Sequence, residues 1–136
     1  MTIVLDGSVG VYFADRGEKL LYDRVRLLDN GYCHGLRTQE YAQTFYPPHE
    51  IKRVHDPTGD DPAEQEIDAE YVIDHGAEVW VGEDRDVEGT TTAALLPGGW
   101  LVCWSPGGGT RYYPAHMVDS VHTHTNDEQE AAGWFR

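Results

Sequence analysis

Lysine is almost absent from this sequence. Only Lys19 and Lys52 occur among 136 residues, whereas aspartate and glutamate together number 24, and the formal net charge is −14. Abundant acid with so little lysine is typical of proteins from salt-loving microbes, in which molar salt screens the repulsion between carboxylates. We therefore expect a halophilic host, an archaeon or its virus. The alternative is an ordinary acidic protein.

Long apolar runs and cysteine pairs are scarce too. No stretch is long and apolar enough to predict a membrane span, and none resembles a secretory signal peptide. The two cysteines, Cys33 and Cys103, are too few for a disulfide framework, and each lies in an apolar strand pattern. We expect two buried thiols in a cytoplasmic protein, or in a virion if a virus encodes it, and no membrane partner.

Enzyme signatures are also missing. There is no Gly-x-Ser-x-Gly motif, neither cysteine has a convincing base beside it, and the glycines before Thr110 lack the lysine of a phosphate-binding loop. Zinc needs three or four ligands, and the weak candidates are His116, His122 and His124. We therefore predict a non-enzymatic protein with no cofactor.

One phrase is written twice, in residues 45–55 and 112–122. Both copies read aromatic-Tyr-Pro-x-His-x-aliphatic-x-x-Val-His. Proline cannot donate to a sheet ladder, so it ends the preceding strand, and the next residues suit one tight or 3₁₀ turn before a short closing strand. The histidines are expected to hydrogen-bond loop backbone. The residues of this turn motif are Tyr46, Pro47, His49, Tyr113, Pro114 and His116.

The repetition extends upstream of the phrase. A shift of 68 places residues 4–6 on 72–74 and residues 27–32 on 95–100, and the phrase itself follows at a shift of 67. Ordered matches of this kind predict a tandem duplication. The expected parts are a first unit at 1–55, an acidic Pro/Gly linker at 56–69, a second unit at 70–125, and an acidic tail at 126–136 that ends in Trp134-Phe135.

Strand patterns dominate both units, and little of the chain has helical periodicity. Asn30-Gly31 is a strong hairpin signal, and turn chemistry at 6–8 and an acidic loop at 82–89 are expected to separate strands. A unit of about 60 residues is marginal alone, so the two units are expected to share a core or an interface.

The second unit resembles small Src-homology-3-like barrels. Residues 98–102 place an aromatic after a turn, as those domains do, and Gly109 followed by 113–118 resembles their Gly-x-aromatic-Pro-x-x-x-Val closing turn. Their Ala-Leu-Tyr-Asp-Tyr stretch is absent and Leu101 replaces their second tryptophan, so the resemblance implies the barrel layout rather than polyproline recognition. We predict an all-β fold with two tandem duplicated Src-homology-3-like small β-barrel units packed together.

The two halves differ in charge. Seven basic and seven acidic side chains cancel in residues 1–55, whereas three basic and seventeen acidic ones leave −14 in residues 56–136. An uncharged region of a halophilic protein suggests contact, and arginine and aromatic residues are enriched in interfaces. The alternation of the second strand places Tyr22, Arg24 and Arg26 on one face, opposite Val25 and Leu27. The candidate binding residues are Tyr22, Arg24, Arg26, Arg37, Tyr41 and Arg53.

This surface predicts an adaptor or assembly component that binds a protein partner or itself. The alternatives are a nucleic-acid-binding module that uses the same arginines and tyrosines, and a small metal-binding protein. Salt separates the first two possibilities, because phosphate contacts weaken steeply as salt rises whereas apolar assembly does not.

Overall fold

The structure is a computed structural model. It describes residues 3–60, 71–73, 77–81 and 86–123, except for residues 16, 18, 41 and 91, and it gives no side-chain detail for 71–73, 77–78, 86–90 and 122–123. Most of the predicted linker and the whole predicted acidic tail lie outside the described residues.

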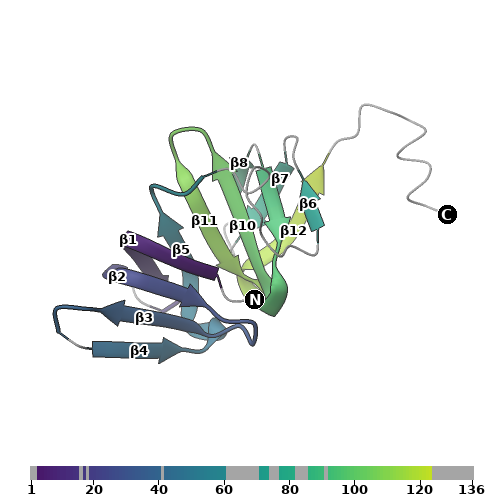
Figure 1. Cartoon of the computed structure of the whole chain (residues 1–136). Coiled ribbons are helices and arrows are strands. Elements are labelled where there is room, and N and C mark those ends of the chain that lie inside the picture. Colours follow the sequence, from purple (N-terminus) through teal and green to yellow (C-terminus); the bar gives the residue numbers. More distant parts are fainter. Residues whose placement is uncertain are drawn as a thin grey trace.

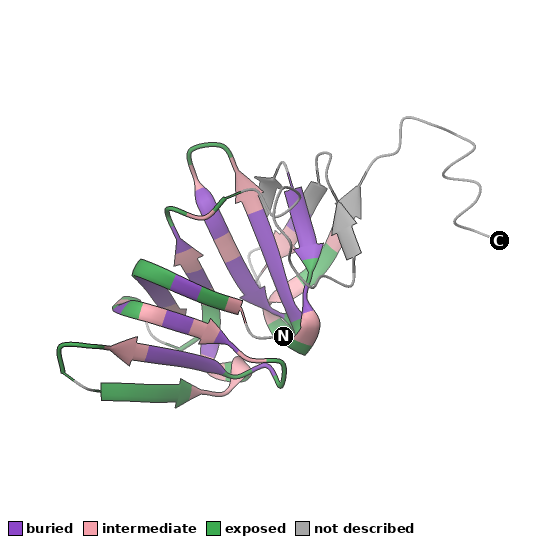
Figure 2. Cartoon of the chain, viewed as in Figure 1, coloured by how far each residue is buried: buried purple, intermediate pink, exposed green. Residues whose placement is uncertain are grey.

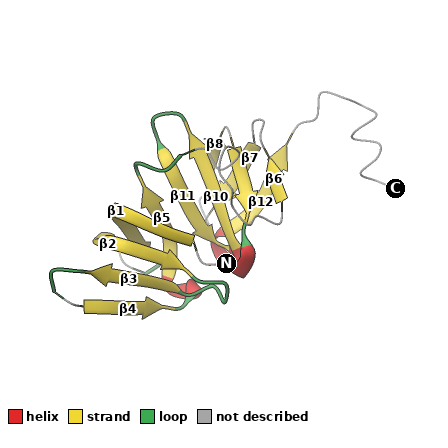
Figure 3. Cartoon of the chain, viewed as in Figure 1, coloured by secondary structure: helices red, strands yellow, loops and turns green. Residues whose placement is uncertain are grey.

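The described residues form an all-β fold whose helices are single 3₁₀ turns (Figure 3). None of these helices is long and apolar enough to cross a membrane. The first segment, residues 3–56, contains β1 (Ile3–Phe13), β2 (Lys19–Leu27), β3 (Cys33–Arg37), β4 (Ala42–Tyr46), η1 (Pro48–Glu50) and β5 (Ile51–Asp56). The second segment, residues 71–123, contains β6 (Tyr71–Ile73), β7 (Ala77–Val81), β8 (Asp86–Thr90), β9 (Thr92–Leu95), η3 (Pro97–Gly99), β10 (Trp100–Ser105), β11 (Gly109–Pro114), η4 (Ala115–Met117) and β12 (Val118–Thr123).

The strands form two antiparallel sheets. The larger sheet has the order β4-β3-β2-β1-β5-β11-β10-β9-β6, and the smaller one has the order β12-β7-β8. The ladder between β5 and β11 joins the two segments, so the large sheet runs from one segment into the other (Figure 1).

Two predicted loops are strand instead. The turn expected at 6–8 is a bulge within the continuous strand β1, where the register shifts between Asp6 and Val9 and Gly7 has φ +110°. Cross-strand pairing with β2 on both sides of the bulge keeps the strand continuous. The acidic loop expected at 82–89 is wrong for residues 86–89, which belong to β8 and pair with β7.

Cross-strand pairing in the first segment recurs in the second. Cys33 pairs with Tyr46 as Leu101 pairs with Tyr113. Every pair of the ladders β1–β2, β2–β3, β3–β4 and β1–β5 recurs at a shift of 68 for the first three strands and 67 for the last two, except Asp6 with Arg24, whose counterpart Asp74 lies outside the described residues. The tandem duplication stays a prediction, which superposition of the two segments tests.

The buried side chains form two cores. The smaller core belongs to the second segment alone and contains Val79, Ala93, Leu101, Cys103 and Tyr113. The larger core combines ten buried residues of the first segment with Ala94, Leu96, Trp100, Val102 and Tyr112 of the second. In Figure 2 the buried colour accordingly continues from the strands of the first segment into β10 and β11. The second segment therefore completes the core of the first.

Candidate protein-contact surface

Tyr22 is buried, so its prediction as an exposed contact residue is wrong. It is 5% exposed, and Val25 and Leu27 are buried on the same side of the sheet. The predicted alternation fails because the three steps from Asp6 to Val9 in β1 lie opposite only two steps from Arg24 to Tyr22 in β2, so both strands cannot alternate regularly there. The ring of Tyr22 lies over Gly35, where a Cβ would come within 2.6 Å of it.

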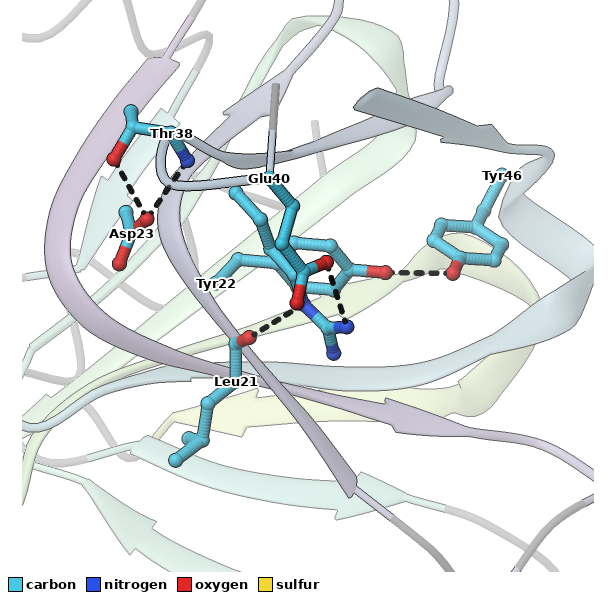
Figure 4. A network of polar contacts seen from close by, with 7 residues as sticks. Leu21, Tyr22, Asp23, Thr38, Glu40 and Tyr46 are labelled. Atoms are coloured by element: carbon cyan, nitrogen blue, oxygen red, sulfur yellow. Dashed lines mark hydrogen bonds and ion pairs between the residues drawn. The ribbon is translucent and has the colours of Figure 1, made fainter. Parts of the chain in front are cut away.

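Polar contacts hold Tyr22 and its neighbours in place (Figure 4). The Tyr22 and Tyr46 hydroxyls lie 2.7 Å apart, and burial together with this hydrogen bond raises the pKa of Tyr22. The Arg37 guanidinium lies 5.1 Å from the Tyr22 ring centre and 3.8 Å from the Glu40 carboxylate. These contacts tie β2 to β3 and β4, so Tyr22 and Arg37 support the fold.

A further contact fixes the connection that follows β3. The Asp23 carboxylate accepts hydrogen bonds from the backbone N–H of Thr38 at 2.8 Å and from its hydroxyl at 2.9 Å. These bonds lower the pKa of Asp23. Thr38, the first residue after β3, is thereby held against β2.

The other predicted binding residues divide between separate contacts. Arg24 donates from Nε to Asp6 Oδ1 at 2.6 Å, and the Arg53 guanidinium lies 4.2 Å from the ring centre of Tyr12. Tyr41 lies outside the described residues. The structure therefore brings Arg24 and Arg26 together on β2 and places Arg37 and Arg53 in other surroundings.

Arg24 and Arg26 belong to a face that spans four strands. Directly paired residues of antiparallel strands point to the same side, so the pairing of Val4 with Arg26, of Arg26 with His34 and of His34 with Phe45 forms one row across β1 to β4. Leu36 lies beside Arg24 in the next row. We name this surface the outer face; its residues are Val4, Arg24, Arg26, His34, Leu36 and Phe45.

The outer face is partly apolar. Phe45 is 53% exposed and Val4 is 48% exposed. The rings of His34 and Phe45 stack with centres 4.3 Å apart, and His34 Nε2 lies 3.0 Å from Gln43 Oε1. Sequence reasoning missed Val4, His34 and Phe45. Strand alternation from Arg24 and Arg26 into β3 and β4 is the signal that would have found them.

The outer face ends at an open strand edge. β4 is the terminal strand of the nine-stranded sheet, and no described strand pairs with its outer edge. Figure 2 shows most of β4 exposed. Unpaired backbone N–H and C=O groups on such an edge favour pairing with another strand.

The two copies of the repeated phrase form matching turns that contact each other. Each proline, Pro47 at φ −67° and Pro114 at φ −69°, precedes a 3₁₀ turn, and a strand follows. Burial lowers the pKa of His116, and the nearby His49 lowers it further, while a hydrogen bond with the Ile51 backbone raises it. The histidines thus lie where the two segments meet.

The described residues contain no group of three or more metal-ligating side chains. The side chains of His122 and His124, two of the weak candidates, lie outside the described residues. No family model, curated protein or solved structure matches the chain.

Proposed function

We propose that this protein is a non-enzymatic assembly component or adaptor that binds protein through the outer face and the edge of β4. The observation that carries the proposal is Phe45, a large apolar side chain that is 53% exposed on the last strand of a sheet. Apolar contact and strand pairing are available at the same place. This combination suits the addition of a strand from a partner.

The charges of the outer face support a protein partner over a nucleic acid. Arg24 pairs with Asp6, whose carboxylate lies beside it. Arg37 pairs with Glu40 rather than extending the face. Nucleic-acid surfaces need cations that track successive phosphates, and here carboxylates neutralise two of the candidate arginines.

A photo-crosslinking amino acid placed at position 45 tests the proposal. Leu21 is the matched control, because it is also 53% exposed but lies outside the outer face. In an extract of the source organism, the probe at 45 is expected to capture protein, including other copies of this chain, whereas the probe at 21 captures little. Equal capture at both positions would refute the assignment of this surface.

Nucleic-acid binding, the alternative, is tested by a mobility shift at moderate and then molar salt. Binding that disappears as salt rises and is weakened by Arg26→Ala would favour the nucleic-acid module. We expect no shift at either salt concentration.

We also propose that the protein works in a salt-rich cell. Residues 56–136 contain seventeen carboxylates and only three basic side chains, so the carboxylates repel one another at low ionic strength. The melting temperature is expected to rise as potassium chloride increases from tens of millimolar to molar. A flat or falling melting temperature would count against a halophilic host.

A further inference from the structure

The junction between the two segments joins unlike edges. It pairs β5, the last strand of the first segment, with β11, the last strand but one of the second, and Val54 lies opposite Tyr112. The recurring registers make β4 the counterpart of β11 and β12 the counterpart of β5. In the described part of the chain, neither β4 nor β12 has a strand on its outer edge. In each segment, therefore, the counterpart of a strand that forms the junction has an open outer edge.

Side-chain exposure also differs between the junction strands and their counterparts in the first segment. Tyr112 is 8% exposed and Trp100 is 2% exposed, because both belong to the core that the segments share. Their counterparts in the first segment, Phe45 and Tyr32, are 53% and 40% exposed. At these two positions the first segment exposes side chains whose counterparts the second segment buries, whereas His34 is buried as its counterpart Val102 is.

The opposite pattern holds at the other end. Leu27 is 2% exposed in the core that the second segment completes, whereas its counterpart Leu95 is 43% exposed. An apolar position that is covered in the first segment is therefore uncovered in the second. The exposed Phe45 and Leu95 are thus the counterparts of Tyr112 and Leu27, which are buried in the core that the two segments share.

We infer that a second copy of this chain covers the outer face, with β4 of one copy pairing with β12 of the next. The inference rests on the proposed function, because it names the partner of that surface. Shifting the β5–β11 register by 67 places Phe45 opposite Val121, Thr44 opposite His122 and Gln43 opposite Thr123. Contact between unlike surfaces forms a ring if the rotation closes and a fibre if it does not.

Net charge favours a head-to-tail arrangement of two copies. Residues 1–55, which carry the outer face, have no net charge, whereas residues 56–136 carry the whole net charge of −14. Contact between the first segment of one copy and the second segment of the next therefore avoids the repulsion that two acidic halves would meet.

Site-directed disulfide formation between two variants, each with one cysteine added to the buried native Cys33 and Cys103, tests the register. A chain with Phe45→Cys is mixed with a chain with Val121→Cys under mild oxidation, and Leu21→Cys with Val121→Cys is the control. The native Cys33 is poorly reactive, because burial raises its pKa to about 12. We expect a mixed 45–121 dimer and little 21–121 dimer. Predominant 45–45 dimers would overturn the head-to-tail arrangement.

Light scattering of the unmodified chain provides a second measurement that needs no cysteine variant. The mass is expected to rise with concentration, and Phe45→Ser is expected to weaken the association by about tenfold or more. Leu21→Ser should leave it unchanged. A monomer at every concentration would overturn the inference. If the probe at 45 then still captured a different protein, the proposed function would stand; without such capture, both would fail.

Discussion

The two segments of this protein share one pattern of strand pairing and differ in which surfaces they bury. In the second segment Ala94, Val102 and Tyr112 lie in the shared core. The corresponding positions of the first segment hold Arg26, His34 and Phe45, of which Arg26 is partly buried, His34 is buried and Phe45 is exposed. The same strand pairing therefore occurs whether the side chains on one face of the sheet are buried or exposed. The side chains at a few positions match the environment that each segment occupies.

The inner sides differ in a similar way. Tyr22 lies over Gly35 in the first segment, and the counterparts of this pair are Thr90 and Cys103. A large side chain opposite glycine is replaced by two residues of moderate size. Cys103 is buried where the first segment has Gly35, so the side-chain volume at this core position differs while the strand pairing stays the same.

The largest expected loss of stability comes from placing in the second segment the arginine that the first segment has at the equivalent position. Ala94→Arg would place a guanidinium where the side chain is 1% exposed and belongs to the apolar core. An unpaired buried charge costs about 3–5 kcal/mol, so the variant should be largely unfolded by circular dichroism. The reverse change at the counterpart, Arg26→Ala, should alter stability little. Equal loss in both variants would remove the distinction between the two faces.

Filling the space above Gly35 should have the next largest effect. A Cβ at this position would lie 2.6 Å from the Tyr22 ring, and Gly35→Ala is expected to lower the free energy of unfolding by about 1–3 kcal/mol. Gly17→Ala is the control, since no heavy atom lies within 4 Å of its added Cβ. Urea denaturation measures both, and an unchanged midpoint for Gly35→Ala would show that Tyr22 can move aside.

Removing the Tyr22 hydroxyl should have a smaller effect. Tyr22→Phe deletes the 2.7 Å hydrogen bond to Tyr46 but keeps the ring over Gly35, and the expected loss is about 1 kcal/mol. Tyr22→Ser removes the ring as well and should cost several times more. If Tyr22→Phe and Tyr22→Ser had the same melting temperature, the hydroxyl rather than the ring would hold β2 in place.

The smallest expected effect concerns pH at the contact between the two turns. The pKa of His116 is lowered by burial and by His49, so the folded protein binds this proton less readily than the unfolded chain. The contribution is complete above the ordinary histidine pKa of about 6.5 and is lost as pH falls through the lower folded value. His116→Gln should therefore reduce the fall in melting temperature between about pH 7 and about pH 5. Parallel curves for both proteins would contradict this role.

Much of the fold was predictable because strand signals are local. Alternating apolar residues, the Asn30-Gly31 turn and the prolines of the repeated phrase predict an all-β fold and its main turns, and the structure is all-β. The bulge at Gly7 was not predictable from composition, because the same Asp-Gly-Ser sequence suits a turn that reverses the chain. Residues before and after Gly7 both pair with β2, so the segment is a bulge within one strand and not a turn that reverses the chain.

The sequence by itself determined the strands, the repeated phrase and the uneven distribution of charge, since each depends on residues close together in the chain or on composition alone. Only the tertiary structure decided which faces are covered. It buried Tyr22, placed Phe45 at an open edge, and joined β5 to β11. The physical reason is that a strand has two faces and two edges of similar backbone chemistry, and long-range contacts choose which of them meet water.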